Sequence, residues 1–227
     1  MPGVTRRAAL AAIGGCVAIR PAAAQTVTPG PITPVGRRLV ALLDGMNVES
    51  LWQRGYHIDW RTGVSEGPPE TTPGGHTHCS AFVAAVADRL GIYILRPPEH
   101  GQNFLANAQE RWLNSPSASG WNRIGRLGDP GASLRAVALA NRGKLAVAIY
   151  FQPPLSTVAG GKELSGHSAI IRPSEKSPAL IDSEGPDEIQ AGTVNHRLVA
   201  LRDGFRSHKD AWSGGAIEYF WHDANPP

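Results

Sequence analysis

The order of its periodic segments constrains the fold of this chain more than any other feature. Apolar residues recur at helical spacing in the first part, whereas the later part holds short apolar runs bounded by glycine and proline. The segments with helical spacing are 37–45, 76–91, 101–113 and 132–141. The expected strands are 145–151, 168–171, 179–181 and 216–221, with weaker ones at 188–191 and 198–201. Because no crossover helices separate these strands, the pattern predicts an α+β fold with an antiparallel sheet.

The segment 76–91 has the clearest helical pattern. Apolar residues recur from Phe82 to Leu90, and Gly91 follows where a left-handed C-terminal cap is expected. Thr77 is the expected N-cap, which places Cys79 in the first turn.

Composition limits the class of protein. The chain has 227 residues, of which 41% are hydrophobic and 18% charged, and no apolar run is long enough to span a bilayer. These values exclude a disordered chain and a coiled coil. We expect an extended linker at 25–36, rich in threonine and proline, followed by a single domain at 37–227.

The first 24 residues predict an export signal. Arg6 and Arg7 precede a mildly apolar stretch, no acidic residue is present, and alanines at 22–24 suit signal peptidase. The pattern resembles a twin-arginine signal, which implies a periplasmic or secreted protein. The alternatives are a lipoprotein anchor at Cys16 and a buried N-terminal helix.

Cleavage after Ala24 would change both the charge and the cysteine count. Three arginines would leave, so that 19 basic residues balance 19 acidic ones, and no basic cluster remains to bind nucleic acid. Cys16 would also leave, and Cys79 alone cannot form an internal disulfide. Such a thiol is either buried and inert or retained for its reactivity.

Cys79 and His167 fit nucleophilic catalysis. The dipole at the start of a helix favours an anion, so the Cys79 thiol is expected to ionise more easily than a free cysteine. His167 stands at the entrance of the predicted strand 168–171, from which it could activate the thiol. A third polar side chain would then orient the imidazole.

Three segments resemble motifs of the NlpC/P60 and CHAP families of papain-like cysteine hydrolases. His-Cys-Ser-Ala-Phe-Val at 78–83 is similar to the start of their catalytic helix. Gly-His-Ser-Ala-Ile-Ile at 166–171 resembles their Gly-His-Val-Gly-Ile-Val strand, and Glu-Ile-Gln-Ala-Gly at 188–192 resembles a later strand. The resemblance implies a papain-like fold in which helices pack on an antiparallel sheet. It implies Cys79 as nucleophile, His167 as base and Gln190 as the orienting residue.

The match with these families is incomplete. His78 replaces a common aspartate, and the interval from His167 to Gln190 is longer than usual, so Asp182 and Asn195 remain alternatives for the third role. The segment 55–60 falls where the families place a substrate-lining stretch. The substrate-binding candidates there are Tyr56, His57 and Trp60.

The resemblance implies a cysteine amidohydrolase that cleaves peptidoglycan peptides, within the stem or next to muramic acid, without a metal or other cofactor. Stable membrane insertion is not expected, and acyl transfer to an amine and control by an inhibitor protein remain open. One alternative is a zinc hydrolase whose ligands are drawn from His57, Asp59, His76, His78 and His167. Another is a catalytically inactive wall-binding module.

Overall fold

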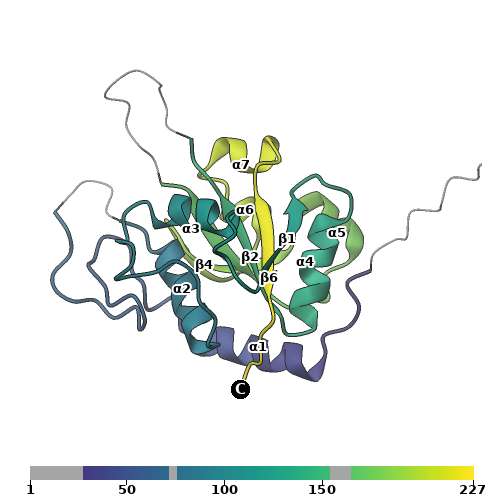
Figure 1. Ribbon diagram of the computed structural model, residues 1–227, viewed down its shortest axis with the longest axis horizontal. Helices are drawn as coiled ribbons and strands as arrows, with labels where there is room; N and C mark the ends of the chain where they lie inside the picture. Colours follow the sequence, from purple (N-terminus) through teal and green to yellow (C-terminus); the bar gives the residue numbers. More distant parts are fainter. Residues whose placement is uncertain (1–27, 72–75, 154–164) are drawn as a thin grey trace, which may run out of the picture.

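A six-stranded antiparallel sheet lies at the centre of the computed structural model, which describes residues 28–71, 76–153 and 165–227. The strand order is β1-β6-β2-β3-β4-β5 (Figure 1). The strands are β1 (Trp121–Arg126), β2 (Leu145–Tyr150), β3 (His167–Ile171), β4 (Asp187–Ala191), β5 (Asn195–Ala200) and β6 (Glu218–His222). The helices are α1 (Pro34–Gly45), α2 (Cys79–Arg89), α3 (Leu105–Leu113), α4 (Ala132–Asn141), α5 (Pro178–Glu184), α6 (Leu201–Gly204) and α7 (Lys209–Ser213).

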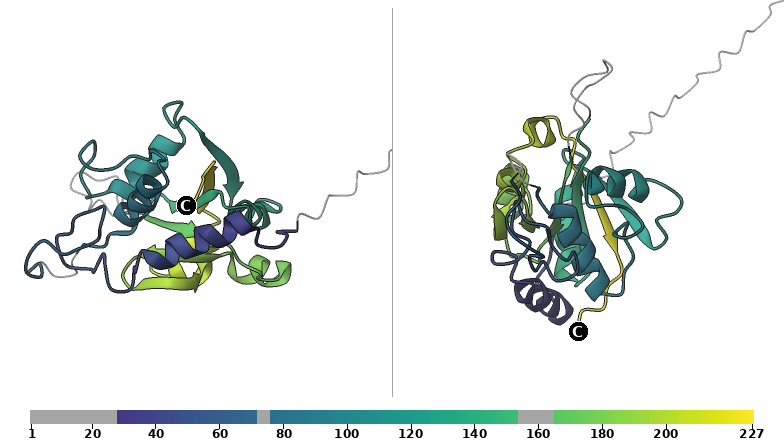
Figure 2. Two further views of the ribbon diagram at one scale, coloured as in Figure 1. Left: turned by 90° about the horizontal axis from the view of Figure 1, so that it is seen from below. Right: turned by 90° about the vertical axis from the view of Figure 1, so that its left-hand side faces the viewer.

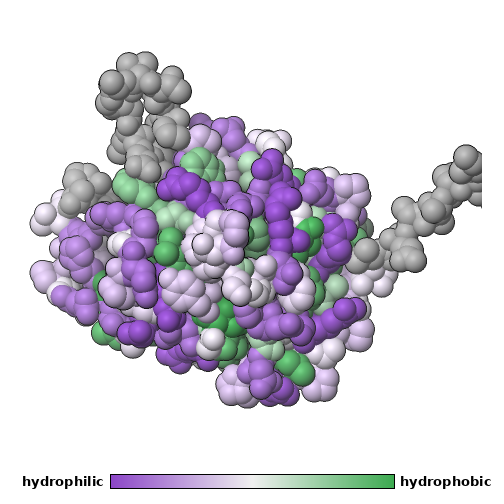
Figure 3. All heavy atoms as spheres, viewed as in Figure 1, coloured by the Kyte–Doolittle hydropathy of each residue, from purple (hydrophilic) through white to green (hydrophobic). Residues whose placement is uncertain are grey.

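Both faces of the sheet are buried, because helices cover each of them (Figure 2). Side chains alternate across a strand, and in β2 Leu145, Val147 and Ile149 enter the core formed with α1 and α2. Ala146 and Ala148 enter the opposite core with α4, α5 and α6. On the outside, hydrophobic residues are scattered among hydrophilic ones on the face shown in Figure 3.

Helix α2 is the central helix of the first core. Its first nine residues, 79–87, are all buried, and it packs against β3 and β4. The ring of Phe82 meets that of Trp52 edge-on, with 5.2 Å between ring centroids. Burial on all sides explains the nearly unbroken apolar sequence of this helix.

The α+β class and the antiparallel sheet are confirmed. Helix α4 has the bounds that the spacing predicts, and Gly91 has φ +69° just beyond α2, as expected for a left-handed cap. Thr77 is not the N-cap of α2, because His78 occupies that position without a side-chain hydrogen bond.

One predicted strand is wrong, since 179–181 lies within α5. Ser177 caps this helix by accepting a hydrogen bond from the amide of Leu180, and Pro178 occupies its first turn. These start signals outweigh an apolar run of only three residues. Strand β1 and helices α6 and α7 have no counterpart in the sequence prediction, and β1 pairs irregularly with β6.

The N-terminal boundaries differ in part from expectation. Helix α1 begins at Pro34, within the segment predicted as a linker, because Thr33 caps it and donates to the carbonyl of Asn141. The predicted export signal, 1–24, lies outside the described residues. Within the described part of the chain, no helix is long and apolar enough to cross a membrane.

Gly36→Ala tests the close approach of α1 to α4. Alanine is favoured over glycine in a helix by about 1 kcal/mol, but a Cβ here would lie 2.2 Å from the carbonyl oxygen of Asn141. We expect the free energy of unfolding in urea to fall by about 1–3 kcal/mol. Gly45→Ala is the control, because no atom lies within 4 Å of its Cβ and its stability should be unchanged or higher. Equal effects of the two substitutions would contradict the packing.

Candidate active site

Cys79 is the first residue of α2, and its side chain is buried against β3. The residue is 2% exposed, and it is the only free cysteine among the described residues. The amide and hydroxyl groups of Ser168 lie close enough to the thiol to affect its ionisation. Ser168 directly follows His167 in the chain, so the predicted nucleophile and base both lie near the start of β3, but successive side chains of a strand point to opposite faces of the sheet.

Burial raises the pKa of the Cys79 thiol above its ordinary value, and the polar groups of Ser168 and Ser80 offset only part of this rise. The expectation that the helix dipole makes this thiol easier to ionise is therefore wrong for this structure. Desolvation of the anion in a closed core outweighs the favourable position at a helix start. Cys79 is a neutral thiol at neutral pH.

His167 lies on the side of the sheet that α6 covers. It is 4% exposed, and the ring of Phe205 meets its imidazole edge-on, with 4.6 Å between ring centroids. Burial lowers the pKa of His167 to about 4, so the ring is neutral at pH 7. Within the described residues, no hydrogen bond joins its imidazole to the Cys79 thiol.

Gln190 is the residue that orients His167 in this structure. Its Oε1 accepts a hydrogen bond from His167 Nε2, which leaves Nδ1 as the nitrogen available for proton transfer. The alternatives lie elsewhere: Asp182 belongs to α5, and Asn195 donates to the carbonyls of Val48, Leu51 and Trp52. Of the three sequence candidates, the structure brings only Gln190 to the imidazole.

Asn107 of α3 fixes the backbone just before His167. Its Oδ1 accepts hydrogen bonds from the amides of Gly166 and Gln152, at 2.9 and 3.0 Å. Gly166 must be a glycine, because a Cβ would lie 2.1 Å from the carbonyl oxygen of Tyr150. These two hydrogen bonds fix the backbone where β3 begins. Nothing in the sequence around Asn107 indicates that its side chain has this role.

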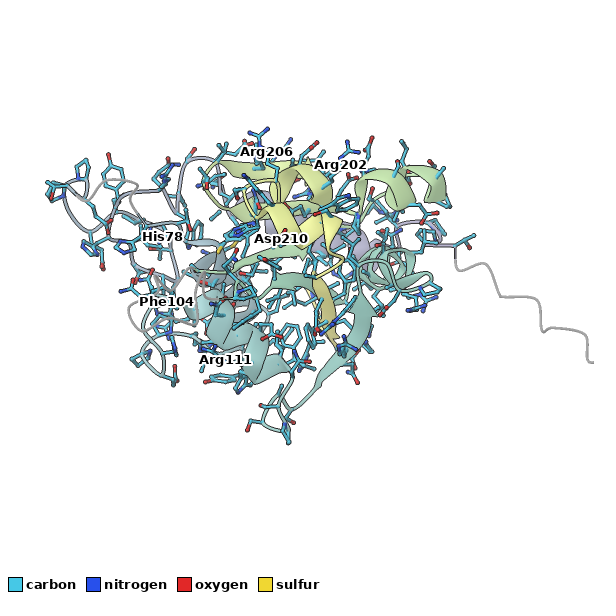
Figure 4. All side chains as sticks on the ribbon, turned by 90° about the horizontal axis from the view of Figure 1, so that it is seen from above. His78, Phe104, Arg111, Arg202, Arg206 and Asp210 are labelled. Atoms are coloured by element: carbon cyan, nitrogen blue, oxygen red, sulfur yellow. The ribbon has the colours of Figure 1, made fainter. Side chains whose placement is uncertain are left out.

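A pocket of about 100 Å³ opens beside His167. Most of its lining residues are polar, and they come from the segment just before α2, the β4–β5 turn and the segment that contains α6. The side chains that line it include His167, Gln190, His196, Asp203, Arg206 and His208. Figure 4 shows the surrounding surface from above. Arg206 and Asp210 lie with the α6 and α7 segments, and His78 and Phe104 lie to their left, at the start of α2 and just before α3.

The aromatic candidates for substrate binding are dispersed. Tyr56 packs partly buried against the first core, and His57 is an exposed side chain 3.7 Å from a carboxylate oxygen of Glu70. Trp60 is 8% exposed, and the guanidinium groups of Arg61 and Arg96 lie over its ring. None of the three lines the pocket beside His167.

The histidines of the zinc alternative do not gather around one point. His57 and His76 both lie against Glu70 at the surface, whereas His78 is buried and neither of its ring nitrogens has a hydrogen bond within the described residues. Burial lowers the pKa of His78, and the nearby backbone of Tyr56 and side chain of Gln102 oppose this only in part. Among the described residues, no three histidine, cysteine or acidic side chains are grouped as metal ligands.

The sequence was compared with models of protein families and with curated proteins, and neither comparison gives a match. The site must therefore be interpreted from its own geometry.

The buried imidazole predicts a pH dependence of stability. The pKa of His167 is about 4 in the folded protein and 6.5 when unfolded, so only the unfolded chain gains this proton between these values. The free energy of unfolding should therefore fall as the pH drops from 6.5 to 4, by about 3 kcal/mol from this residue. Urea denaturation across this range measures the fall.

His167→Gln should make that fall shallower, because the titrating ring is gone. His100→Ala removes a histidine outside the site and should leave the slope unchanged. Parallel pH profiles for the unaltered protein and His167→Gln would contradict the burial of a neutral imidazole.

Proposed function

We propose that this chain is an exported cysteine amidohydrolase of papain-like architecture that cleaves an amide bond in peptidoglycan peptides. The proposal rests on one observation above all. The single thiol of the described residues, Cys79, stands at the start of a buried helix and lies beside Ser168. Ser168 follows His167, whose Nε2 donates a hydrogen bond to Gln190. The substrate class and the export rest on the motif resemblance and on the pattern of residues 1–24.

Cys79 and His167 would perform the reaction as an acyl transfer through a thioester. As Sγ bonds to the substrate carbonyl carbon, the thiol proton passes to His167 Nδ1. The imidazolium then gives this proton to the leaving amine as the C–N bond breaks. Water next attacks the thioester with His167 as base, which releases the carboxylic acid and restores the thiol.

The electrostatics favour a neutral resting pair over a preformed thiolate and imidazolium. Burial disfavours the charged form of both Cys79 and His167, so the proton moves only as the new C–S bond forms. The thiol and Nδ1 must approach within hydrogen-bonding distance when substrate binds. Such contacts are commonly looser in the free enzyme than in its complexes.

Backbone amides at the start of α2 supply the means to stabilise the oxyanion. The first four N–H groups of a helix lack acceptors within that helix, and the amide of Cys79 is among them. An oxyanion formed on the carbonyl that Cys79 attacks would lie next to this amide and at the positive end of the helix dipole.

A second candidate function is an inactive wall-binding module. The observation that favours it is the absence, within the described residues, of a hydrogen bond between the buried Cys79 thiol and His167. In that case the protein would bind peptidoglycan peptides without cleaving them.

Incubation of residues 25–227 with purified peptidoglycan separates these functions. The protein should release peptide fragments, detected by mass spectrometry, whose masses identify the cleaved bond. Cys79→Ala and His167→Ala should each reduce release by a factor of about 1,000 or more, because each removes a partner in the covalent step. His100→Ala is the matched control and should retain full release, since its imidazole bonds only the adjacent Gly101 carbonyl.

Fragment release that persists in Cys79→Ala would contradict the cysteine mechanism. Binding of peptidoglycan without release by the unaltered protein would favour the inactive module. Release abolished by a chelator and restored by zinc would instead support metal-dependent chemistry.

A further inference from the structure

His208 lies next to His167, although the sequence offers no motif that links them. The two imidazole rings are nearly parallel, at 19°, and their centroids are 5.4 Å apart. His208 is the residue before α7, and it also lines the pocket beside His167. The predicted base therefore has a second imidazole stacked on one face.

The position of His208 is itself fixed by two residues near the end of β2. Its Nδ1 lies 3.4 Å from Gln152 Oε1 in a hydrogen bond. The ring of Tyr150 lies 5.4 Å from the ring of His208, centroid to centroid. Since Tyr150 pairs with His167 across β2 and β3, the three rings form one cluster.

We propose that His208 is a positioning residue for His167: its stacked ring, together with Gln190 and Phe205, holds the imidazole in the one orientation that leaves Nδ1 available. This inference rests on the proposed function, in which His167 is the base. Gln190 fixes one ring nitrogen and Phe205 meets the ring edge-on. The stacked ring of His208 covers one face of the imidazole and so restrains rotation of its plane.

His208 is itself half-buried and covers one face of the His167 imidazole beside the pocket. Burial lowers the pKa of both imidazoles to about 4, and the charge of a protonated His167 further disfavours a proton on His208. Other titratable groups also face this cluster from the neighbouring elements. They are Tyr150 of β2, Glu188 of β4, His196 of β5, Asp203 of α6 and Arg206 after α6.

Glu188 is a buried acid of β4 in this environment. Its carboxyl is fully buried and has no hydrogen bond within the part of the chain that the structure describes, and burial raises its pKa well above the ordinary value. His167 and His208 therefore form a stacked pair of imidazoles that is neutral at pH 7. Removal of the His208 ring would open the imidazole of His167 to water from the pocket.

The test compares His208→Ala, which removes the ring, with His208→Phe, which keeps a stacking ring without nitrogen. Lys209→Ala is the matched control, because this exposed side chain directly follows His208. Nitrogen-15 NMR of the imidazoles reports the tautomer and pKa of His167 in each protein. Thermal unfolding verifies that each variant is folded, and fragment release from peptidoglycan reports turnover.

In His208→Ala, we expect His167 to lose its single Nε2–H tautomer and its pKa to rise from about 4 toward 6.5. Fragment release should slow by about tenfold or more, because a displaced base transfers its proton poorly. His208→Phe should keep the tautomer, the low pKa and most of the turnover, and Lys209→Ala should match the unaltered protein.

An unchanged tautomer and pKa of His167 in folded His208→Ala would overturn the proposal. Failure of His208→Phe to preserve them would overturn the stacking argument. The NMR result is independent of substrate, so a protein that releases no fragments but shows the expected NMR changes would contradict the hydrolase function alone.

Discussion

The packing of α2 on β3 and β4 is the contact on which the rest of the structure depends. It lies at the centre of the first hydrophobic core, and it sets the first residue of the helix, Cys79, against Ser168. On the other side of the same strand, α6 and the segment after it enclose His167. The candidate site thus lies where helices from both faces of the sheet meet the start of β3.

This arrangement explains why the site is neutral at rest. The helix start favours a thiolate, but complete burial of the Cys79 side chain has the larger effect and raises its pKa. The same desolvation lowers the pKa of His167. Charge separation is therefore costly in the free enzyme, so in the proposed mechanism the proton moves from Cys79 to His167 as the thiol attacks the substrate carbonyl.

The sequence predicts local features well and distant contacts poorly. The spacing of apolar residues correctly predicts the bounds of α4 and the left-handed conformation of Gly91. The two strand motifs name His167 and Gln190 as partners, and the structure has a hydrogen bond between them. In contrast, the strand predicted at 179–181 is wrong, because three apolar residues suit either a strand or a helix and only the capping residues decide.

The remaining features could not be predicted because they depend on the tertiary fold. Asn107 and His208 lie far in sequence from His167, and each contacts its surroundings only once the sheet is assembled. The raised pKa of Cys79 likewise depends on burial that no local pattern shows. Single polar residues outside any motif are thus the part of a site that sequence periodicity cannot reveal.

The central claim is that Cys79 forms a covalent acyl-enzyme. Acid quenching during turnover with peptidoglycan fragments, followed by peptide mass spectrometry, tests it directly. The account predicts that the peptide containing Cys79 gains the mass of the acyl part of the substrate, as a thioester that hydroxylamine removes. Continued fragment release with an unmodified Cys79 peptide, under conditions that trap thioesters, would contradict the account.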